Sequence, residues 1–371
     1  MSFIALIIKN LVRQRIRTSL TVLGISMGIT TVVALGVVTS SLKESAGEII
    51  RLGQADFMVA QEGAADLTFS LVAEEDATAL AAYQDVARAE GVLFHVVHVG
   101  SNPFFFLVGR DAADLAASPP SSMEGRLLAP DAIDEVMLGR RAADELDAKI
   151  GDAVTIDDIS FRVVGTYQTG SLWEDGGAYA PLTAVQEMSA KSGVVTAVYI
   201  TVEPGADAAA VADGIEDDFE NLVTIADVGE FGKVDQGVEF MDAANIAISV
   251  LAVGIGAIGV MNTMIMSVLE RTREIGILRA VGWSGRRILR MIIGESLLLC
   301  VIAAAVGTAL GVLATRAVLL IDMVSNLMEP QYTPDIFIRG LIVAVVVALL
   351  GAIYPAVRAV RLTPLEALRY E

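Results

Sequence analysis

Residue types that commonly carry catalysis, metal binding or nucleotide binding are few in this sequence. Its two histidines, His95 and His98, lie three positions apart, and in a strand such a pair points to opposite faces. Carboxylates are so numerous that close pairs are expected by chance. The phosphate-binding pattern GxxxxGK(S/T) is missing, because the single Gly-Lys pair, Gly232-Lys233, lacks the upstream glycine. We therefore expect no catalytic, metal-binding or cofactor-binding residues in these 371 residues.

A charge-dense segment, residues 270–274 with the sequence ERTRE, separates two long apolar stretches. A helix of this composition indicates docking against a polar partner. Gly276 and Gly282 would then permit a close approach or a bend in the chain. The alternative is a solvated loop near a membrane, which would not need so dense a pattern.

The composition indicates a membrane protein with one acidic domain. Hydrophobic residues make up 54% of the chain, and the mean hydropathy is +0.61. The net charge of −19 arises in residues 42–241, which hold 11 basic and 36 acidic residues, whereas the remainder is net positive. A basic surface is missing, so nucleic acid is excluded as a partner. The single cysteine, Cys300, lies in an apolar stretch and cannot form an intrachain disulfide.

Four charge-free apolar windows reach or approach the roughly 20 helical residues that cross a bilayer. They cover residues 18–42, 243–269, 296–315 and 340–357. The predicted fold is an integral membrane protein with four transmembrane helices and a large mixed α/β extracytoplasmic domain inserted between helices 1 and 2. The predicted segments are an N-terminal helix over 1–17, transmembrane helices over 18–42, 242–269, 291–321 and 336–357, the external domain over 43–241, a cytoplasmic segment over 270–290, an external loop over 322–335 and a cytoplasmic tail over 358–371.

Basic residues near the window ends indicate the orientation, because cytoplasmic loops are enriched in Lys and Arg. They concentrate before the first window, between the second and third, and after the fourth. We therefore expect both termini and residues 270–290 in the cytoplasm, and residues 43–241 outside the plasma (inner) membrane. The first window is too long for a cleavable signal peptide and no small-residue cleavage site follows it, so we expect a retained span. Residues 3–12 are either an interfacial amphipathic helix or an extension of that span.

Glycines recur at a spacing that favours helix packing in lipid. Gly24 and Gly28 form one GxxxG pair, and Gly307 and Gly311 form another. The second window adds three further glycines, at positions 254, 256 and 259. The two pairs are candidates for helix packing. Because glycine is common in membrane helices, it stays open whether any one of them serves dimerisation.

The acidic insert alternates between strand-like and helix-like patterns. The expected strands cover 56–60, 91–99, 104–108, 153–156, 161–164 and 197–202, and the expected helices cover 74–83, 139–146, 182–189 and 206–220. Phe104, Phe105 and Phe106 are either a buried strand or an exposed grip for an apolar substrate. The whole chain has five lysines and 21 arginines. Together with the excess of Asp and Glu in the insert, this scarcity of lysine favours either a salt-loving source or a genome rich in G and C.

The charge-dense segment carries a family resemblance. Residues 270–283, ERTREIGILRAVGW, resemble the cytoplasmic segment of MacB/FtsX/LolC-type ABC transporter permeases, whose pattern is close to ERTREIGIxxAxGA. Residues 355–371 resemble the same family's ending, PAxRAxRxxPxEALRYE. Short pieces of the insert, such as 108–111, 124–126 and 161–165, resemble its external domain. Topology and insert position agree, so the resemblance covers essentially the whole chain.

The resemblance implies a permease subunit that couples ATP hydrolysis to movement of the external domain, a process called mechanotransmission. ATP and Mg²⁺ would lie on a separate ABC ATPase dimer, since this sequence lacks the phosphate loop that MacB itself carries. The other implied partners are a second permease chain (identical or a related paralogue), membrane lipid and an external adaptor or lipoprotein. The residues implied to couple to the ATPase are Glu270, Arg271, Arg273, Glu274, Gly276, Arg279 and Gly282.

Three classes of function compete. The first is an exporter or extractor of lipoprotein, peptide or drug-like cargo. The second is an FtsX-like signalling platform, which activates external cell-wall enzymes without transport. The large insert favours the exporter, because FtsX-like inserts tend to be smaller. The third class, a membrane enzyme with an external active site, lacks a nucleophile and base.

Overall fold

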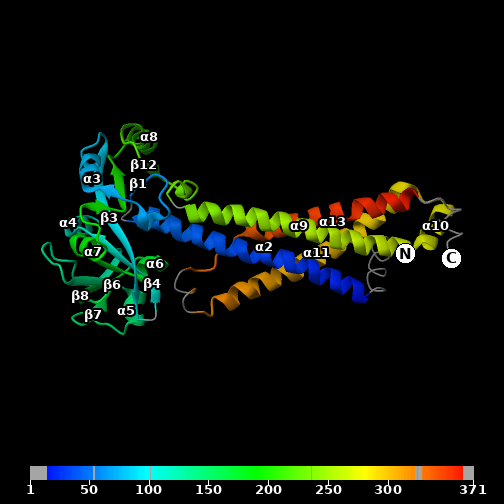
Figure 1. The fold of residues 1–371 in the computed structure, drawn as a ribbon, viewed down its shortest axis with the longest axis horizontal. Helices are drawn as coiled ribbons and strands as arrows, with labels where there is room; N and C mark the ends of the chain where they lie inside the picture. Colours follow the sequence, from blue (N-terminus) through cyan, green and yellow to red (C-terminus); the bar gives the residue numbers. More distant parts are fainter. Residues whose placement is uncertain are drawn as a thin grey trace. The chain divides into compact units, whose positions relative to one another are not determined.

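The computed structural model describes residues 15–52, 55–100, 102–234, 236–321, 324 and 328–361 (Figure 1). The predictions for residues 3–12 and for most of the tail 358–371 lie outside these described residues. The chain divides into two compact units. The helical unit draws on residues 1–38, 242–318 and 330–371, and the external domain draws on residues 39–241 and 319–329.

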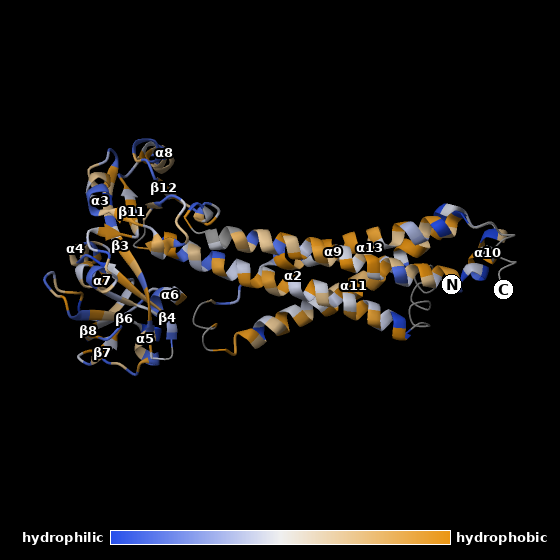
Figure 2. Ribbon diagram, in the orientation of Figure 1, coloured by the Kyte–Doolittle hydropathy of each residue, from blue (hydrophilic) through white to orange (hydrophobic). Residues whose placement is uncertain are grey.

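In the described part of the helical unit there are four long helices and one short helix. The long helices are α2 (Arg15–Ile50), α9 (Gln236–Glu270), α11 (Gly285–Val318) and α13 (Pro334–Arg361), and the short one is α10 (Thr272–Ala280). Each long helix contains a stretch that is long and apolar enough to cross a membrane, and Figure 2 shows their largely hydrophobic colouring. The predicted fold class, four membrane-crossing helices with an α/β domain between the first and second, is confirmed.

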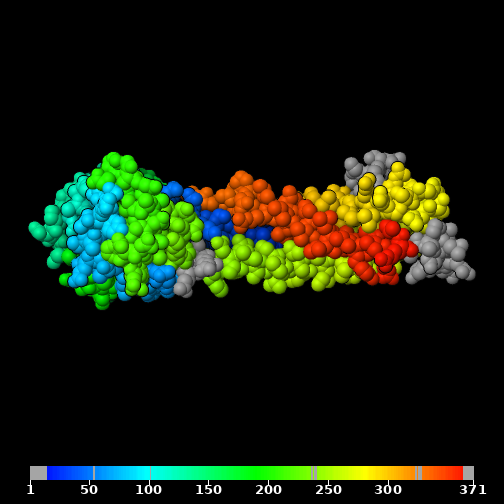
Figure 3. Space-filling model, turned by 90° about the horizontal axis from the view of Figure 1, so that it is seen from above, coloured from blue at the N-terminus to red at the C-terminus, as the bar shows by residue number. Residues whose placement is uncertain are grey.

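A stripe of branched side chains on α2 forms the centre of the helical unit. Ile25, Ile29, Val33 and Val37 recur every four residues, so they share one face of the helix, and all are buried. They pack in one cluster with residues of α9, α11 and α13. Figure 3 shows α11 and α13 side by side, in keeping with their extensive contact. Among its polar links, Ser296 Oγ donates a hydrogen bond of 2.9 Å to the Ala348 carbonyl oxygen.

A mixed sheet of ten strands is the framework of the external domain. Its order is β12-β1-β11-β3-β4-β9-β6-β8-β5, with β7 paired to β8; most neighbours are antiparallel, and β4–β9 and β6–β8 are parallel. The strands are β1 (Phe57–Gln61), β3 (Val86–Val99), β4 (Asn102–Arg110), β5 (Ser122–Gly125), β6 (Glu135–Gly139), β7 (Ala153–Ile156), β8 (Ile159–Gln168), β9 (Ala178–Pro181), β11 (Ala197–Val202) and β12 (Leu222–Ile225). A second sheet pairs β2 (Val72–Ala73) with β10 (Val194–Val195).

Short helices cover this sheet. They are α3 (Glu74–Ala81), α4 (Ala112–Ala117), α5 (Arg140–Glu145), α6 (Leu172–Asp175), α7 (Leu182–Met188) and α8 (Ala208–Asp218), with 3-10 turns η2 (Leu67–Phe69) and η3 (Phe231–Lys233). All six predicted strands and all four predicted helices of the insert are present; the bounds of β7 and β11 are as predicted, and the ends of the others are shifted. The β7–β8 turn has Asp157 and Asp158 at φ +48° and +64°, values that a type I′ hairpin requires and that Asp tolerates.

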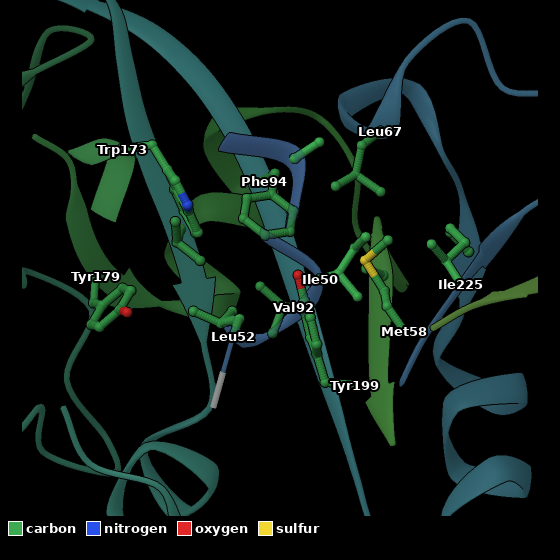
Figure 4. Close-up of a cluster of buried hydrophobic side chains, with 14 of the residues drawn as sticks. Ile50, Leu52, Met58, Leu67, Val92, Phe94, Trp173, Tyr179, Tyr199 and Ile225 are labelled. Carbon is green, nitrogen blue, oxygen red and sulfur yellow. The ribbon is translucent and has the colours of Figure 1, made fainter. Parts of the chain in front are cut away.

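The outer end of α2 belongs to the core of the external domain. Ile50 and Leu52 are buried among Met58, Phe94 and Tyr199, as Figure 4 shows. The hydroxyl of Tyr199 donates a hydrogen bond of 2.8 Å to the carbonyl oxygen of Ile49. The sheet therefore holds the last turn of α2 by apolar burial and by a polar contact.

The three phenylalanines of β4 differ in burial. Phe105 is buried in the core on one face of β4, as the buried-strand prediction requires. Phe104 is exposed and Phe106 is partly buried on the other side of the strand, where they line an apolar pocket. The alternation along β4 separates the core residue from the two pocket residues.

Candidate functional site

The charge-dense segment forms a break between two helices followed by a short helix. α9 ends at Glu270, Arg271 is the N-cap residue of α10, and α10 ends at Ala280. Residues 281–284 then lead into α11, which begins at Gly285. The structure thus places six of the seven predicted coupling residues between Glu270 and Arg279, and the seventh, Gly282, in the following turn.

The side chain of Arg271 faces α11. Its Nη1 atom lies 2.9 Å from Oε1 and 3.1 Å from Oε2 of Glu295, and its Nε atom lies 3.1 Å from Oε2 of Glu274. The side chains of Arg271 and Glu295 are 12% and 5% exposed. Removing one member of such a buried pair leaves an uncompensated charge and costs about 3–5 kcal/mol. Arg271 therefore positions α10 on α11.

One face of α10 is buried against the helical unit. Thr272, Ile275 and Gly276 are buried, and the hydroxyl of Thr272 donates to the carbonyl oxygen of Val268 at 3.1 Å. Ile275 packs in a cluster with Val268, Ile288, Ile292, Ala356 and Ala359, which come from α9, α11 and α13. Gly276 is therefore an inward-facing residue, where a side chain would meet the body of the protein.

The opposite face of α10 is exposed and mixes charged with apolar side chains. Arg273 and Glu274 are exposed, and so are Ile277 (48%) and Val281 (77%). Residues 273, 277 and 281 are four apart and lie on one side of the helix. We call Arg273, Glu274, Ile277 and Val281 the outer face of α10. Ile277 and Val281 thus add exposed apolar area to a charged surface.

Gly282 ends α10 in a Schellman motif. It has φ +98°, a conformation that L-residues with a side chain rarely adopt. The amide of Gly282 donates to the Arg279 carbonyl at 3.1 Å, and the amide of Trp283 donates to the Leu278 carbonyl at 3.0 Å. Gly282 thus fixes where the helix stops, and Arg279, in its last turn, is partly buried.

The inner ends of α2 and α9 are joined by polar contacts. Arg17 Nη2 lies 2.6 Å from Glu270 Oε1, and the hydroxyls of Thr21 and Thr263 lie 2.7 Å apart. Glu270 therefore links the end of α9 to α2 within the chain. Of the seven predicted residues, only Arg273 and Glu274 belong to the outer face of α10.

Sequence reasoning missed Glu295, Ile277 and Val281. Glu295 has a usable signal, since it is an isolated carboxylate at the start of an apolar window. A buried carboxylate requires a partner, which points to a basic residue nearby. Nothing in the sequence indicates that Ile277 and Val281 are exposed.

The two predicted glycine pairs differ in their surroundings. A methyl group at Gly307 would lie 2.7 Å from the carbonyl oxygen of Ser26, and one at Gly311 would lie 2.9 Å from Val33 Cβ. One at Gly28 would lie 3.2 Å from Ala252 Cβ. A methyl group at Gly24 would meet no described atom within 4 Å. Gly28, Gly307 and Gly311 thus permit close helix contacts within this chain.

Among the described residues, no group of three His, Cys, Asp or Glu side chains is arranged to hold a metal ion. His95 is partly buried and His98 is exposed. Burial lowers the pKa of His95, and the nearby carboxylate of Asp157 opposes this change. Both histidines lie on β3, whose pairing with β4 and β11 accounts for their position.

Comparison with known families gives two matches along the chain. Residues 18–218 match the family model described as MacB-like periplasmic core domain. Residues 246–364 match the model described as FtsX-like permease C-terminal. The first match alone covers more than half of the 371 residues.

Several curated proteins resemble the chain. An uncharacterized ABC transporter permease of Methanocaldococcus jannaschii is 29% identical over 61% of this chain and 59% of its own length. The macrolide export ATP-binding/permease protein MacB of Haemophilus ducreyi is 26% identical over 96% of this chain and 54% of its own. The chain thus spans little more than half the length of these relatives. Among solved structures, the periplasmic region of MacB from Actinobacillus actinomycetemcomitans is 14% identical, with a TM-score of 0.38 over 50% of this chain and 92% of that one.

Proposed function

Because the chain belongs to the MacB-like family of ABC transporter permeases, we propose that it couples ATP hydrolysis on a separate ATPase polypeptide to movement of its external domain. The permease assignment and the multi-pass membrane location follow from the family and the four apolar helices. We propose the coupling to ATP hydrolysis, the partner chains and the cargo. The observation that carries the proposal is the exposed outer face of α10, a helix whose opposite face is packed against the helical unit.

The outer face of α10 is the proposed seat of the ATPase. Arg273 and Glu274 supply charge, and Ile277 and Val281 supply apolar area, which is the combination found at the centre and rim of protein interfaces. The inner face cannot shift independently, because Ile275 packs in one hydrophobic cluster with residues of α9, α11 and α13 and Arg271 is paired with Glu295. A push on the outer face would therefore move the helical unit.

A continuous helix supports transmission of that movement. α2 runs without interruption from Arg15 to Ile50. Its inner end is linked to α9 through Arg17 and Glu270, and its outer end is held in the core of the external domain. A helix has a rise of roughly 1.5 Å per residue and is stiff along its axis, so displacement at one end is transmitted to the other.

The partners follow from the same proposal. ATP and Mg²⁺ would bind the ATPase dimer, and a second permease chain, identical or related, would complete the transporter. Both termini and α10 would lie in the cytoplasm, with residues 43–241 outside. Lipoprotein, peptide or drug-like cargo would be exported or extracted, with or without an external adaptor.

Affinity purification tests the coupling site. The tagged full-length chain is purified from its native membranes, and the ATPase that accompanies it is identified and its ATP hydrolysis measured. Arg273→Glu and Val281→Asp should each reduce recovery of the ATPase by at least tenfold, because like charges or a buried carboxylate at an interface cost several kcal/mol. Ser160→Ala, on an exposed position of β8, should change neither quantity. Undiminished recovery and hydrolysis in both α10 variants would exclude this face as the coupling site.

Glu274→Lys and Gly276→Leu are less selective probes. Glu274 is 3.1 Å from Arg271, and Gly276 is buried, so both changes also disturb the attachment of α10 to the helical unit. Arg273 and Val281 report on the outer face alone.

A further inference from the structure

The external domain contains an apolar pocket of about 680 Å³. This volume lies within the roughly 300–1,000 Å³ that small-molecule sites occupy, and it is too small for a folded partner. One wall is the outer part of α2, where Leu42, Ala46 and Ile49 recur every three or four residues on one helix face. Aromatic side chains of η2, β4 and α6 form the opposite walls. The pocket therefore lies entirely within one unit of the structure.

Exposed phenylalanines line the pocket. Phe69 is 64% exposed and Phe104 is 39% exposed, and both line it. Phe106 lines it as well and packs against Trp173 with the ring centroids 6.0 Å apart. Apolar side chains gathered in this way around a concave surface in an acidic domain indicate an apolar ligand body.

Trp173 lines the pocket with a buried side chain. Its side chain lies beside Phe94 (Figure 4), with the ring centroids 5.6 Å apart, and the residue is only 4% exposed. Among the described residues its Nε1 atom has no hydrogen-bond partner. Because this atom is shielded from solvent, the indole ring of Trp173, rather than its N–H group, lines the pocket.

Lys191 contributes a positive charge to the same pocket. Its Nζ atom donates to the carbonyl oxygen of Thr68 and lies 6.0 Å from the ring centroid of Phe69. Among the described residues no ion pair involves Lys191, and Asp66, which also lines the pocket, accepts hydrogen bonds from the amide and hydroxyl of Thr68. Burial lowers the pKa of Lys191, with partial compensation by Asp66. An anion bound beside Lys191 would offset this desolvation.

We propose that this pocket binds a single-chain anionic amphiphile, such as a long-chain fatty acid. Its hydrocarbon lies against Phe69, Phe104 and Phe106, and its anionic group pairs with Lys191. This inference rests on the proposed transport function in one respect only, because it treats the amphiphile as a class of cargo. Ligand binding itself requires no ATPase.

Fluorescence quenching by a brominated long-chain fatty acid tests the proposal. The chain has two tryptophans, so Trp283→Phe leaves Trp173 as the reporter. In full-length protein reconstituted in nanodiscs, the brominated acid should quench Trp173 saturably, whereas the brominated alcohol of the same length should bind at least about tenfold more weakly. Lys191→Gln should weaken binding of the acid by about tenfold and remove its preference over the alcohol, since hydrogen bonds to charged groups are worth that much.

A matched pair of exposed apolar residues controls for surface adsorption. Phe69→Asn should weaken binding, whereas Ile133→Asn, which alters a residue 70% exposed and outside the pocket lining, should not. If the Trp283→Phe background does not fold, equilibrium dialysis of a radiolabelled fatty acid with wild type and Lys191→Gln provides the same comparison.

Three results would overturn the proposal. The first is the lack of saturable quenching, and the second is equal binding of acid and alcohol. The third is equal quenching by a brominated two-chain phospholipid, which would assign the pocket to bilayer lipid. None of these results bears on ATPase recovery with the α10 variants, so failure of the pocket and failure of the coupling site remain distinguishable.

Discussion

Arg271, at the break between α9 and α10, is paired through Nη1 with both carboxylate oxygens of Glu295 in α11, at 2.9 and 3.1 Å. The two residues are 24 positions apart, and the pair is nearly excluded from solvent. The pair and the burial of Ile275 together attach α10, a helix of nine residues, to the long helix α11. Arg271, although it belongs to the charge-dense segment 270–274, therefore makes its contacts inside the protein.

Breaking this pair should destabilise the protein. Arg271→Met and Glu295→Gln should each lower the free energy of unfolding by about 3–5 kcal/mol, since each leaves the other charge buried alone. The double variant should lose less than the sum of the two, and a double-mutant cycle from unfolding in detergent measures the difference. Additive losses would show that the two side chains do not interact. Arg273→Ala, an exposed control, should change stability by no more than about 0.5 kcal/mol.

The glycines of the helical unit should differ sharply in their tolerance of a side chain. Gly307→Leu should destabilise by about 1–3 kcal/mol or more, because even its Cβ atom would lie 2.7 Å from the Ser26 carbonyl oxygen. Gly24→Leu should be tolerated in the monomer, since its Cβ atom meets nothing within 4 Å. Thermal unfolding of both variants in detergent decides this. If Gly24→Leu proves as destabilising as Gly307→Leu, a contact with a second chain at Gly24 is indicated.

The membrane helices and the sheet strands were predictable because their physical signals are local. Apolar length predicts a span, and alternation predicts β3, β4 and β8. The short strands β2 and β10, of two residues each, and the mixed order of the sheet carry no such signal, because they depend on long-range pairing.

The candidate site was predictable only in part. The motif located α10, but the roles of its residues depend on partners distant in sequence. Glu295 turns Arg271 inward, and Arg17 engages Glu270. Gly282 was predicted to permit a bend, and its φ of +98° shows the specific conformation that the helix end uses.

The orientation of the chain can be checked by cysteine labelling. In a Cys300→Ala background, single cysteines at Ser121 and Ser192, both exposed, should react with an impermeant reagent added to intact cells. A cysteine at Ser284, in the turn between α10 and α11, should react only after the cells are broken. Labelling of position 284 from outside would reverse the orientation that the basic residues predict.

The stability of the external domain should depend on pH through Glu174. Burial raises the pKa of Glu174 to about 7, although the hydrogen bond from Tyr179 opposes this rise. The native state therefore holds a proton that the unfolded chain, with a carboxyl pKa near 4.5, releases. The contribution of Glu174 to the unfolding free energy should be highest below about pH 4.5, fall by up to about 3 kcal/mol as the pH rises to about 7, and then level off.

Glu174→Gln should remove this pH dependence. Denaturation followed by Trp173 fluorescence in Trp283→Phe protein, at several pH values, measures it. Asp114, whose pKa burial raises to about 6, contributes with the same sign and is present in both proteins, so the difference isolates Glu174. Identical slopes for the two proteins would show that Glu174 ionises normally in the folded domain.

The acid excess of the external domain should make its stability depend on salt. Several of its few basic residues are already paired, as Arg126 is with Glu135 and Arg140 with Glu124, so most carboxylates face solvent without an opposite charge. On α8, Asp213 and Asp217 are exposed and four residues apart, a spacing at which like charges repel.

Salt of about 1 M shortens the Debye length to about 3 Å and screens such repulsion. The melting temperature of the external domain, followed by Trp173 fluorescence in Trp283→Phe protein, should therefore rise by several degrees between about 0.1 and 2 M KCl. The double variant Asp213→Asn, Asp217→Asn should melt higher at low salt and respond less to KCl, because it removes a repulsive pair while keeping side chains of the same shape. A melting temperature that is flat or falls with KCl would show that carboxylate repulsion does not limit stability, and the scarcity of lysine would then reflect base composition alone.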